Sequence, residues 1–261
     1  MKVTASTARP LGHRLTLRHP ATARQAAPVT RLATAGVLAA MAIAGSTGTA
    51  AAAPTTPLPT FSWSGTDSSP LAGSLDGLLL NARQVSRIAG TNSELRDSKV
   101  DPNLGNQYTV TPPQCLSAYA PGQAGAYADA APEQVAFKSV TSPRDSSTER
   151  LSVWEGVVEF DTKQDSLDFM TRTASSWKSC SGLTVTEAEG GSWEMGQTKV
   201  NDARTVVTLG QEASDGSSSC ERAMAAYRNV FIDVMYCSPD HDPSGKAAAV
   251  VGAIAEQAAS S

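Results

Sequence analysis

The sequence has little of what metal-binding and catalytic proteins usually display. Its 261 residues include only three histidines and four cysteines, and aromatic residues make up 5% of the chain. No two cysteines form the short C-x-x-C pair that structural zinc sites use, and no G-x-S-x-G elbow presents a serine nucleophile. Downstream of the N-terminal region, no apolar run is long enough to cross a bilayer. The sequence therefore predicts no cofactor, no metal site and no assembled catalytic set.

What the N-terminus does have is basic charge followed by a short apolar stretch. The stretch runs from Leu32 to Ala44, and small residues at Ala50 and Ala52 suit signal cleavage after Ala52. The preceding residues contain six basic side chains and no acid: Lys2, Arg9, Arg14, Arg18, Arg24 and Arg31. This layout predicts a secretory signal over residues 1–52. An uncleaved membrane anchor is the alternative, since no charge appears between Arg31 and Asp67.

Removal of this leader makes the chain strongly acidic. Six of the 21 Lys and Arg residues leave and all 25 acids remain, which gives a net charge of −10. An acidic surface disfavours nucleic acid as a partner, and anionic lipid headgroups repel it. We therefore expect an exported chain of the cell envelope or the extracellular space, in contact with a membrane only through an uncleaved N-terminus.

Hydrophobic patterning places one domain at residues 75–261, after a Pro-, Thr- and Ser-rich linker at 53–74. Asn81 and Gly90 bound a short helix, and Thr111-Pro112-Pro113 begins a second one. An amphipathic helix capped by Asp161 ends near Cys180, and an Ala- and Val-rich helix closes the chain.

The remaining periodic segments alternate apolar and polar residues, as strands do. They are residues 133–140, 151–160, 183–188, 192–200, 205–211, 221–227 and 230–236. Turn residues separate them, so successive strands are expected to pair as hairpins. The predicted fold class is α+β, with helices packed on a largely antiparallel sheet.

The cysteines predict two disulfides in an oxidising compartment. Spacing alone does not choose among the three possible pairings. However, Cys220 and Cys237 are symmetric about Arg228-Asn229, so a two-residue turn there would place their sulfurs opposite each other. This favours a bridge between Cys220 and Cys237, which leaves Cys115 to pair with Cys180.

The order of these features resembles a known family. LDGLLL precedes a short helix, PPQC carries the first cysteine, W-x-x-C-S-G spans Trp177 to Gly182, and NVFIDV stands within the last hairpin. The resemblance is to the PknH-like extracellular sensor domain, found on mycobacterial serine/threonine kinases and on free-standing exported proteins. It implies a disulfide-bonded domain outside the plasma membrane, with a cleft for an unidentified ligand.

The chain also departs from that pattern. It has no Gly-rich phosphate loop, strand lysine or H-R-D loop, so we do not expect it to transmit a signal by phosphorylation. No cysteine stands near the predicted cleavage site, so the lipid anchor of many free-standing relatives is not expected.

Three residues are candidates for ligand contact. Trp154 and Trp193 lie within predicted strands, where indole rings line sites for small molecules as readily as they fill cores. Asp233 is polar within an apolar strand, which indicates an edge position, an internal hydrogen bond or a ligand contact. By contrast, His241 stands in a Pro- and Gly-rich loop typical of a solvated turn.

These observations predict an exported, non-enzymatic, sensor-like domain that binds a small molecule or envelope fragment. One alternative is a hydrolase or transferase that acts on envelope polymer through acidic residues. Another is a module that docks onto an envelope protein through an exposed sheet edge.

Overall fold

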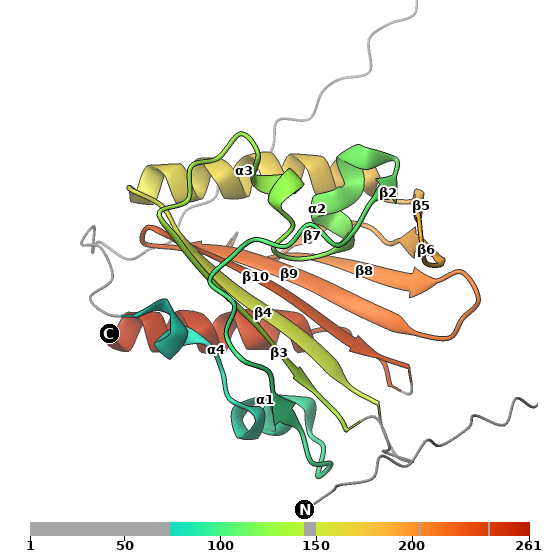
Figure 1. Ribbon diagram of the computed structural model, residues 1–261, viewed down its shortest axis with the longest axis horizontal. Helices are drawn as coiled ribbons and strands as arrows, with labels where there is room; N and C mark the ends of the chain where they lie inside the picture. Colours follow the sequence, from blue (N-terminus) through green and yellow to red (C-terminus); the bar gives the residue numbers. More distant parts are fainter. Residues whose placement is uncertain (1–73, 144–149, 204, 240) are drawn as a thin grey trace, which may run out of the picture. The chain divides into compact units, whose positions relative to one another are not determined.

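The computed structural model describes residues 74–143, 150–203, 205–239 and 241–261 (Figure 1). The predicted signal segment, and the predicted linker up to residue 73, lie outside these residues. Within the described part of the chain, no helix combines the length and the apolar character that a membrane span requires.

A single antiparallel sheet forms the centre of the domain. Its strand order is β1-β3-β4-β10-β9-β8-β6-β5-β2, and β7 pairs separately with β8. The strands are β1 (Arg96–Asp97), β2 (Val110–Thr111), β3 (Gln134–Thr141), β4 (Ser152–Glu159), β5 (Thr184–Glu187), β6 (Ser192–Met195), β7 (Lys199–Val200), β8 (Val207–Ala213), β9 (Ser219–Tyr227) and β10 (Val230–Ser238). The predicted α+β class with a largely antiparallel sheet is confirmed.

Helices cover both faces of the sheet, with α3 on one face and α4 on the other (Figure 1). The α-helices are α1 (Ala82–Ala89), α2 (Leu116–Tyr119), α3 (Lys163–Cys180) and α4 (Lys246–Ser260), and the 3-10 helices are η1 (Leu75–Leu78), η2 (Pro113–Cys115) and η3 (Ala124–Tyr127). Alternation along β10 assigns its side chains to the two layers: Ile232 and Val234 pack in the α4 layer, whereas Phe231 packs against Phe169 of α3.

The central hairpin joins β9 and β10 through the turn at Arg228 and Asn229. Tyr227 pairs with Val230, and Arg228 adopts the left-handed conformation with φ of 52° that such a tight turn requires. The resulting register places Cys220 directly opposite Cys237, and the two are bonded. The predicted cross-strand disulfide is therefore confirmed.

The second disulfide joins Cys115, at the end of η2, to Cys180, the last residue of α3. This pairing also agrees with the prediction. It holds the segment that contains η2 and α2 against the C-terminal end of α3.

Two predicted boundaries are wrong. Thr162, not Asp161, is the N-cap of α3, because Asp165 accepts a hydrogen bond from the Thr162 N–H while Thr162 accepts one from the Asp165 N–H. The predicted strand over 192–200 is divided into β6 and β7. The division falls beside Gly196, whose N–H donates to the Gly210 carbonyl at 2.7 Å.

Candidate functional site

An aromatic cavity of about 240 Å³ opens on the α3 face of the sheet. Trp154 of β4 lies directly across from Met235 of β10 in the strand register, and these side chains gather beside the Cys220–Cys237 bridge. By strand alternation Met235 is on the same face as Phe231, which packs against α3. The disulfide and Met235 thus form a sulfur-rich wall of the cavity, separate from the core beneath α3.

The other walls bring together residues distant in sequence. Trp193 comes from β6, and Tyr119 comes from the end of α2, with their ring centroids 6.4 Å apart at an angle of 76°. Tyr108 precedes β2, and its ring meets that of Tyr119 at 5.4 Å and 79°. Rings that meet nearly at right angles stand as adjacent walls, so four aromatic side chains border the same space.

A carboxylate lies behind the tyrosine wall. The hydroxyl of Tyr119 donates to Oε2 of Glu187 at 2.8 Å. Burial, followed by this hydrogen bond and the nearby negative charge, raises the pKa of Tyr119 far above its ordinary value. Burial and then Glu187 also raise the pKa of Tyr108. Both phenols therefore stay neutral, and Glu187 provides negative charge beside the cavity.

The wall formed by α2 is fixed to the sheet. The side-chain amide of Gln211 in β8 donates to the carbonyl oxygens of Ala118 and Tyr119 at 2.5 and 3.1 Å. Together with the Cys115–Cys180 bridge, these bonds hold Tyr119 in place without a ligand. Of the described residues that line the cavity, none carries a charged side chain. The cavity thus has the walls of a binding site but no acid–base pair.

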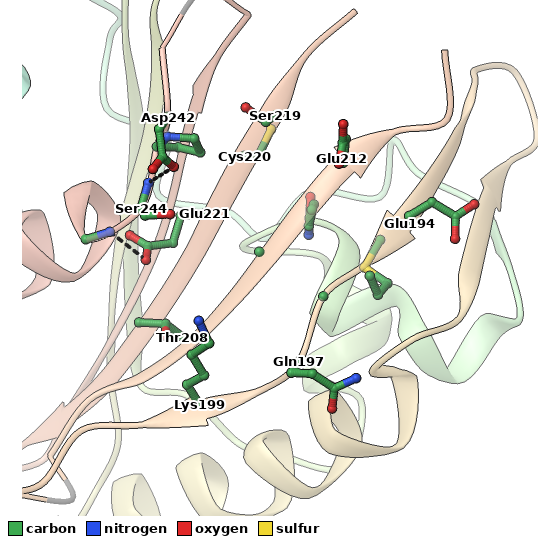
Figure 2. A pocket seen from close by; sticks show the side chains of 16 residues that line it. Glu194, Gln197, Lys199, Thr208, Glu212, Ser219, Cys220, Glu221, Asp242 and Ser244 are labelled. Atoms are coloured by element: carbon green, nitrogen blue, oxygen red, sulfur yellow. Dashed lines mark hydrogen bonds between the residues drawn. The ribbon is translucent and has the colours of Figure 1, made fainter. Parts of the chain in front are cut away.

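A second hollow, of about 660 Å³, lies on the opposite face of the sheet, beside the start of α4 (Figure 2). Figure 2 shows Glu194, Glu212, Glu221 and Asp242 around it, with Lys199 among them. Three of these carboxylates, Glu194, Glu221 and Asp242, have hydrogen-bond partners within the fold.

Glu221 caps α4: it accepts hydrogen bonds from the N–H groups of Gly245, Ala247 and Ala248 at 2.9, 2.8 and 3.3 Å. Asp242 accepts from the Ser244 N–H at 2.9 Å, and Glu194 accepts from the hydroxyls of Thr184 and Ser214 at 2.9 and 3.3 Å. These hydrogen bonds give all three carboxylates a structural role within the fold. Over the described ranges, no three His, Cys, Asp or Glu side chains converge in a way that would hold a metal ion.

The structure separates the three candidate ligand-contact residues. Trp154 and Trp193 border the same aromatic cavity, although strand patterning alone did not bring them together. Asp233 lies in the α3-side core instead, 4% exposed, where it pairs with Arg222 and accepts bonds from the Gly122 N–H and the Tyr127 hydroxyl. The internal hydrogen bond considered for Asp233 is present, and β10 is a central strand, not an edge.

Sequence reasoning missed Tyr108, Tyr119 and Met235 as cavity residues, and Glu187 as the adjacent charge. Tyr119 follows the predicted start of the second helix, where an aromatic residue also suits a helix core, and Tyr108 stands in a segment with no clear periodicity. The pairing of β2 with β5 brings this segment to the sheet. The local sequence carries no signal for that long-range pairing.

These features define a class of protein: an α+β domain with one antiparallel sheet, helices on both faces, two disulfides and an uncharged aromatic cavity. The chain belongs to the PknH-like extracellular domain family, whose model matches residues 70–257. The resemblance drawn from the sequence is thereby confirmed.

Individual relatives agree with this assignment. The chain is 29% identical over 166 residues to the serine/threonine-protein kinase PknH of Mycobacterium bovis and to that of Mycobacterium tuberculosis. The match covers 62% of this chain but only 26–27% of those proteins, about a quarter of their length. The crystal structure of the extracellular domain of PknH from Mycobacterium tuberculosis has the same fold, with a TM-score of 0.68 and 24% identity over 75% of this chain and all of that one.

Proposed function

We propose that this chain is an exported, sensor-like domain that binds a small molecule or cell-envelope fragment in the aromatic cavity, without chemically changing it. The main observation in support of this proposal is that Trp154 and Trp193 border one cavity, although their strands are far apart in the sequence. Tyr108 and Tyr119 complete its aromatic walls. Aromatic side chains that converge on a cavity, with a few polar groups beside them, are characteristic of binding sites.

Two further observations support a binding role. The α2 wall is fixed in advance by Gln211 and a disulfide, so a ligand would lose little free energy in ordering the site. The cavity lining, in its described residues, has no carboxylate pair or nucleophile–base pair for acid–base chemistry.

Docking through a sheet edge has less structural support. Both edge strands of the described sheet, β1 and β2, are only two residues long, so they offer little backbone for an added strand. A protein partner in the envelope remains a prediction that a pull-down tests directly.

The test is a thermal melt of the oxidised chain with fractionated envelope extract. A ligand at about 100 times its Kd stabilises the folded state by roughly 2.7 kcal/mol, which gives a readable shift. Ser218→Tyr should fill the cavity from its rim and abolish the shift. Ser217→Tyr, the preceding exposed residue outside the lining, is the matched control. A shift that survives Ser218→Tyr, or no shift from any fraction, would contradict the proposal.

A further inference from the structure

The aromatic cavity has a chemical preference that goes beyond binding as such, and this inference rests on the proposed function. Its walls are the rings of Tyr108, Tyr119, Trp154 and Trp193, together with the sulfur atoms of Met235 and the Cys220–Cys237 bridge. Aromatic faces carry partial negative charge and attract cations, most strongly where water is excluded. Several rings arranged as adjacent walls favour a rounded cation over a flat molecule.

The charges around the cavity have the matching sign. Glu187 is half-buried and lies 2.8 Å from the hydroxyl of Tyr119, so a negative charge acts on the wall from behind. The nearby cation Arg222, two residues from Cys220, is already neutralised by its ion pair with Asp233. Among the described residues that line the cavity itself, none has a positive side chain.

Part of the hydrogen-bonding capacity of the cavity is already used within the fold. Gln211 uses its amide donor on the carbonyls of Ala118 and Tyr119, and Tyr119 uses its hydroxyl proton on Glu187. The remaining polar groups of the lining are neutral: the hydroxyls of Ser152, Ser218 and Tyr108 and the indole N–H groups of Trp154 and Trp193. A polyhydroxylated sugar would have only these neutral groups for its many hydroxyls, and each hydroxyl left without a partner is unfavourable in a partly dry site. A cation that needs no hydrogen bonds avoids this loss.

The geometry points to an organic ammonium group as the ligand, of the quaternary or alkylated type, held among the four rings beside Glu187. The cavity volume of about 240 Å³ is consistent with this assignment. It falls below the ~300–1,000 Å³ of pockets that enclose drug-sized ligands, and it suits a headgroup instead.

The first test compares choline with 3,3-dimethylbutan-1-ol, a neutral molecule of the same shape, on the oxidised full chain. Binding is followed by tryptophan fluorescence and by thermal shift. We expect choline to bind about tenfold or more tightly, because only the cation gains from the rings and from Glu187. Equal or tighter binding of the neutral isostere would overturn the ammonium assignment while leaving the proposed cavity function intact. Binding of neither probe would overturn the assignment too, and the response to envelope extract then decides the proposed function separately.

Variants separate charge from shape. Glu187→Gln keeps an acceptor for Tyr119 and should weaken choline several-fold without changing the affinity for the neutral isostere. Glu189→Gln, on an exposed residue two positions on, is the matched control. Trp193→Leu keeps apolar bulk but removes a π face, so it should reduce the preference for choline over the isostere. An unchanged preference in both cavity variants would contradict the proposal; the wild-type comparison holds even if a variant fails to fold.

Vesicles decide the source of the ammonium group. Sedimentation with phosphatidylcholine vesicles but not with phosphatidylglycerol vesicles, reversed by free choline, would support a lipid headgroup. Binding of free choline without sedimentation would support a soluble cation. Sedimentation with both vesicle types that choline does not reverse would contradict recognition of the ammonium group.

Discussion

The backbone N–H of Leu80 donates a hydrogen bond of 2.9 Å to the carboxylate of Glu155, 75 residues later in the chain. Glu155 lies on β4 and is fully buried beneath the segment that leads into α1. Burial is the main cause that raises its pKa, from 4.5 to about 7, although the Leu80 N–H and Lys138 at 3.9 Å oppose the rise. The N-terminal part of the domain is therefore attached to the sheet through a carboxyl group that titrates near neutrality.

This relationship predicts a pH dependence of stability. Because the folded-state pKa lies above the unfolded value, the folded state binds more protons between about pH 4.5 and 7. The contribution of Glu155 is therefore fully present below pH 4.5 and is lost as the pH rises toward 7. The total loss is on the order of 3 kcal/mol. Urea unfolding across this range should show Glu155→Gln less dependent on pH than the wild type.

Glu133→Gln is the control, because Glu133 is exposed at the start of the same hairpin. Its stability should follow the wild-type profile at each pH. Identical slopes for Glu155→Gln and the wild type would show that Glu155 does not titrate in this window.

The ion pair between Arg222 and Asp233 gives a second prediction. Both side chains are almost completely buried, and Arg222 also lies over the ring of Trp177 at 5.1 Å. Asp233→Asn keeps one acceptor oxygen, which the Gly122 N–H and the Tyr127 hydroxyl already share, but it leaves the guanidinium uncompensated. We expect it to lower the free energy of unfolding by about 3–5 kcal/mol. The double variant Arg222→Met/Asp233→Asn should recover most of this loss, as measured by urea unfolding.

These variants also decide the role of Asp233. An internal structural role requires a large loss of stability in the single variant and its recovery in the double variant. A single variant that folds as stably as the wild type but no longer responds to ligand would instead make Asp233 a binding residue.

Local patterns were sufficient to predict most of the fold. Asn81 begins α1 as predicted, where it forms a reciprocal cap with Gln84, and Gly90 ends that helix in the left-handed conformation. The symmetry of two cysteines about Arg228-Asn229 predicts both the central turn and its disulfide. Such features depend on residues close in sequence or on the register of one hairpin, so a single sequence contains their cause.

The missed features depend on long-range contacts. β1 and β2 are two residues each, too short for a hydrophobic period, and they exist only because β3 and β5 offer partners. The cavity also depends on long-range contacts. The sequence indicates Trp154 and Trp193 as separate candidates, and only the order of the strands in the sheet places them around one cavity. Tyr119 is held at the cavity by the hydrogen bond that its carbonyl oxygen accepts from the side chain of Gln211, 92 residues later in the chain. No local pattern encodes that contact.

The two disulfides should contribute unequally to stability. The Cys115–Cys180 bridge closes 65 residues and the Cys220–Cys237 bridge closes 17. The chain-entropy estimate gives about 4 and about 3 kcal/mol, respectively. We expect Cys115→Ser/Cys180→Ser to lower the free energy of unfolding more than Cys220→Ser/Cys237→Ser. Urea unfolding of the two variants gives this comparison, and the reverse order would contradict it.

The same pair of variants separates stability from binding. Cys220 and Cys237 line the aromatic cavity, whereas Cys115 and Cys180 lie outside its lining. Below the unfolding transition, removal of the hairpin bridge should therefore weaken the ligand response directly. Removal of the other bridge should act through the position of Tyr119.

Gly156 and Phe137 provide the last prediction. The ring of Phe137 covers Gly156 on the neighbouring strand so closely that a Cβ at Gly156 would lie 1.8 Å from the ring. Gly156→Ala must displace this ring within the sheet, and such overpacking typically costs about 1–3 kcal/mol. Gly210→Ala is the matched control: this glycine is also in a strand, but a Cβ there meets nothing within 4 Å. Chemical unfolding should show a clear loss for Gly156→Ala and little change for Gly210→Ala. If the ring of Phe137 is held in place, the double variant Gly156→Ala/Phe137→Leu should regain much of the lost stability. Equal stability of Gly156→Ala and Gly210→Ala would contradict this prediction, because it would mean that Phe137 moves aside freely. The double variant would then show no recovery.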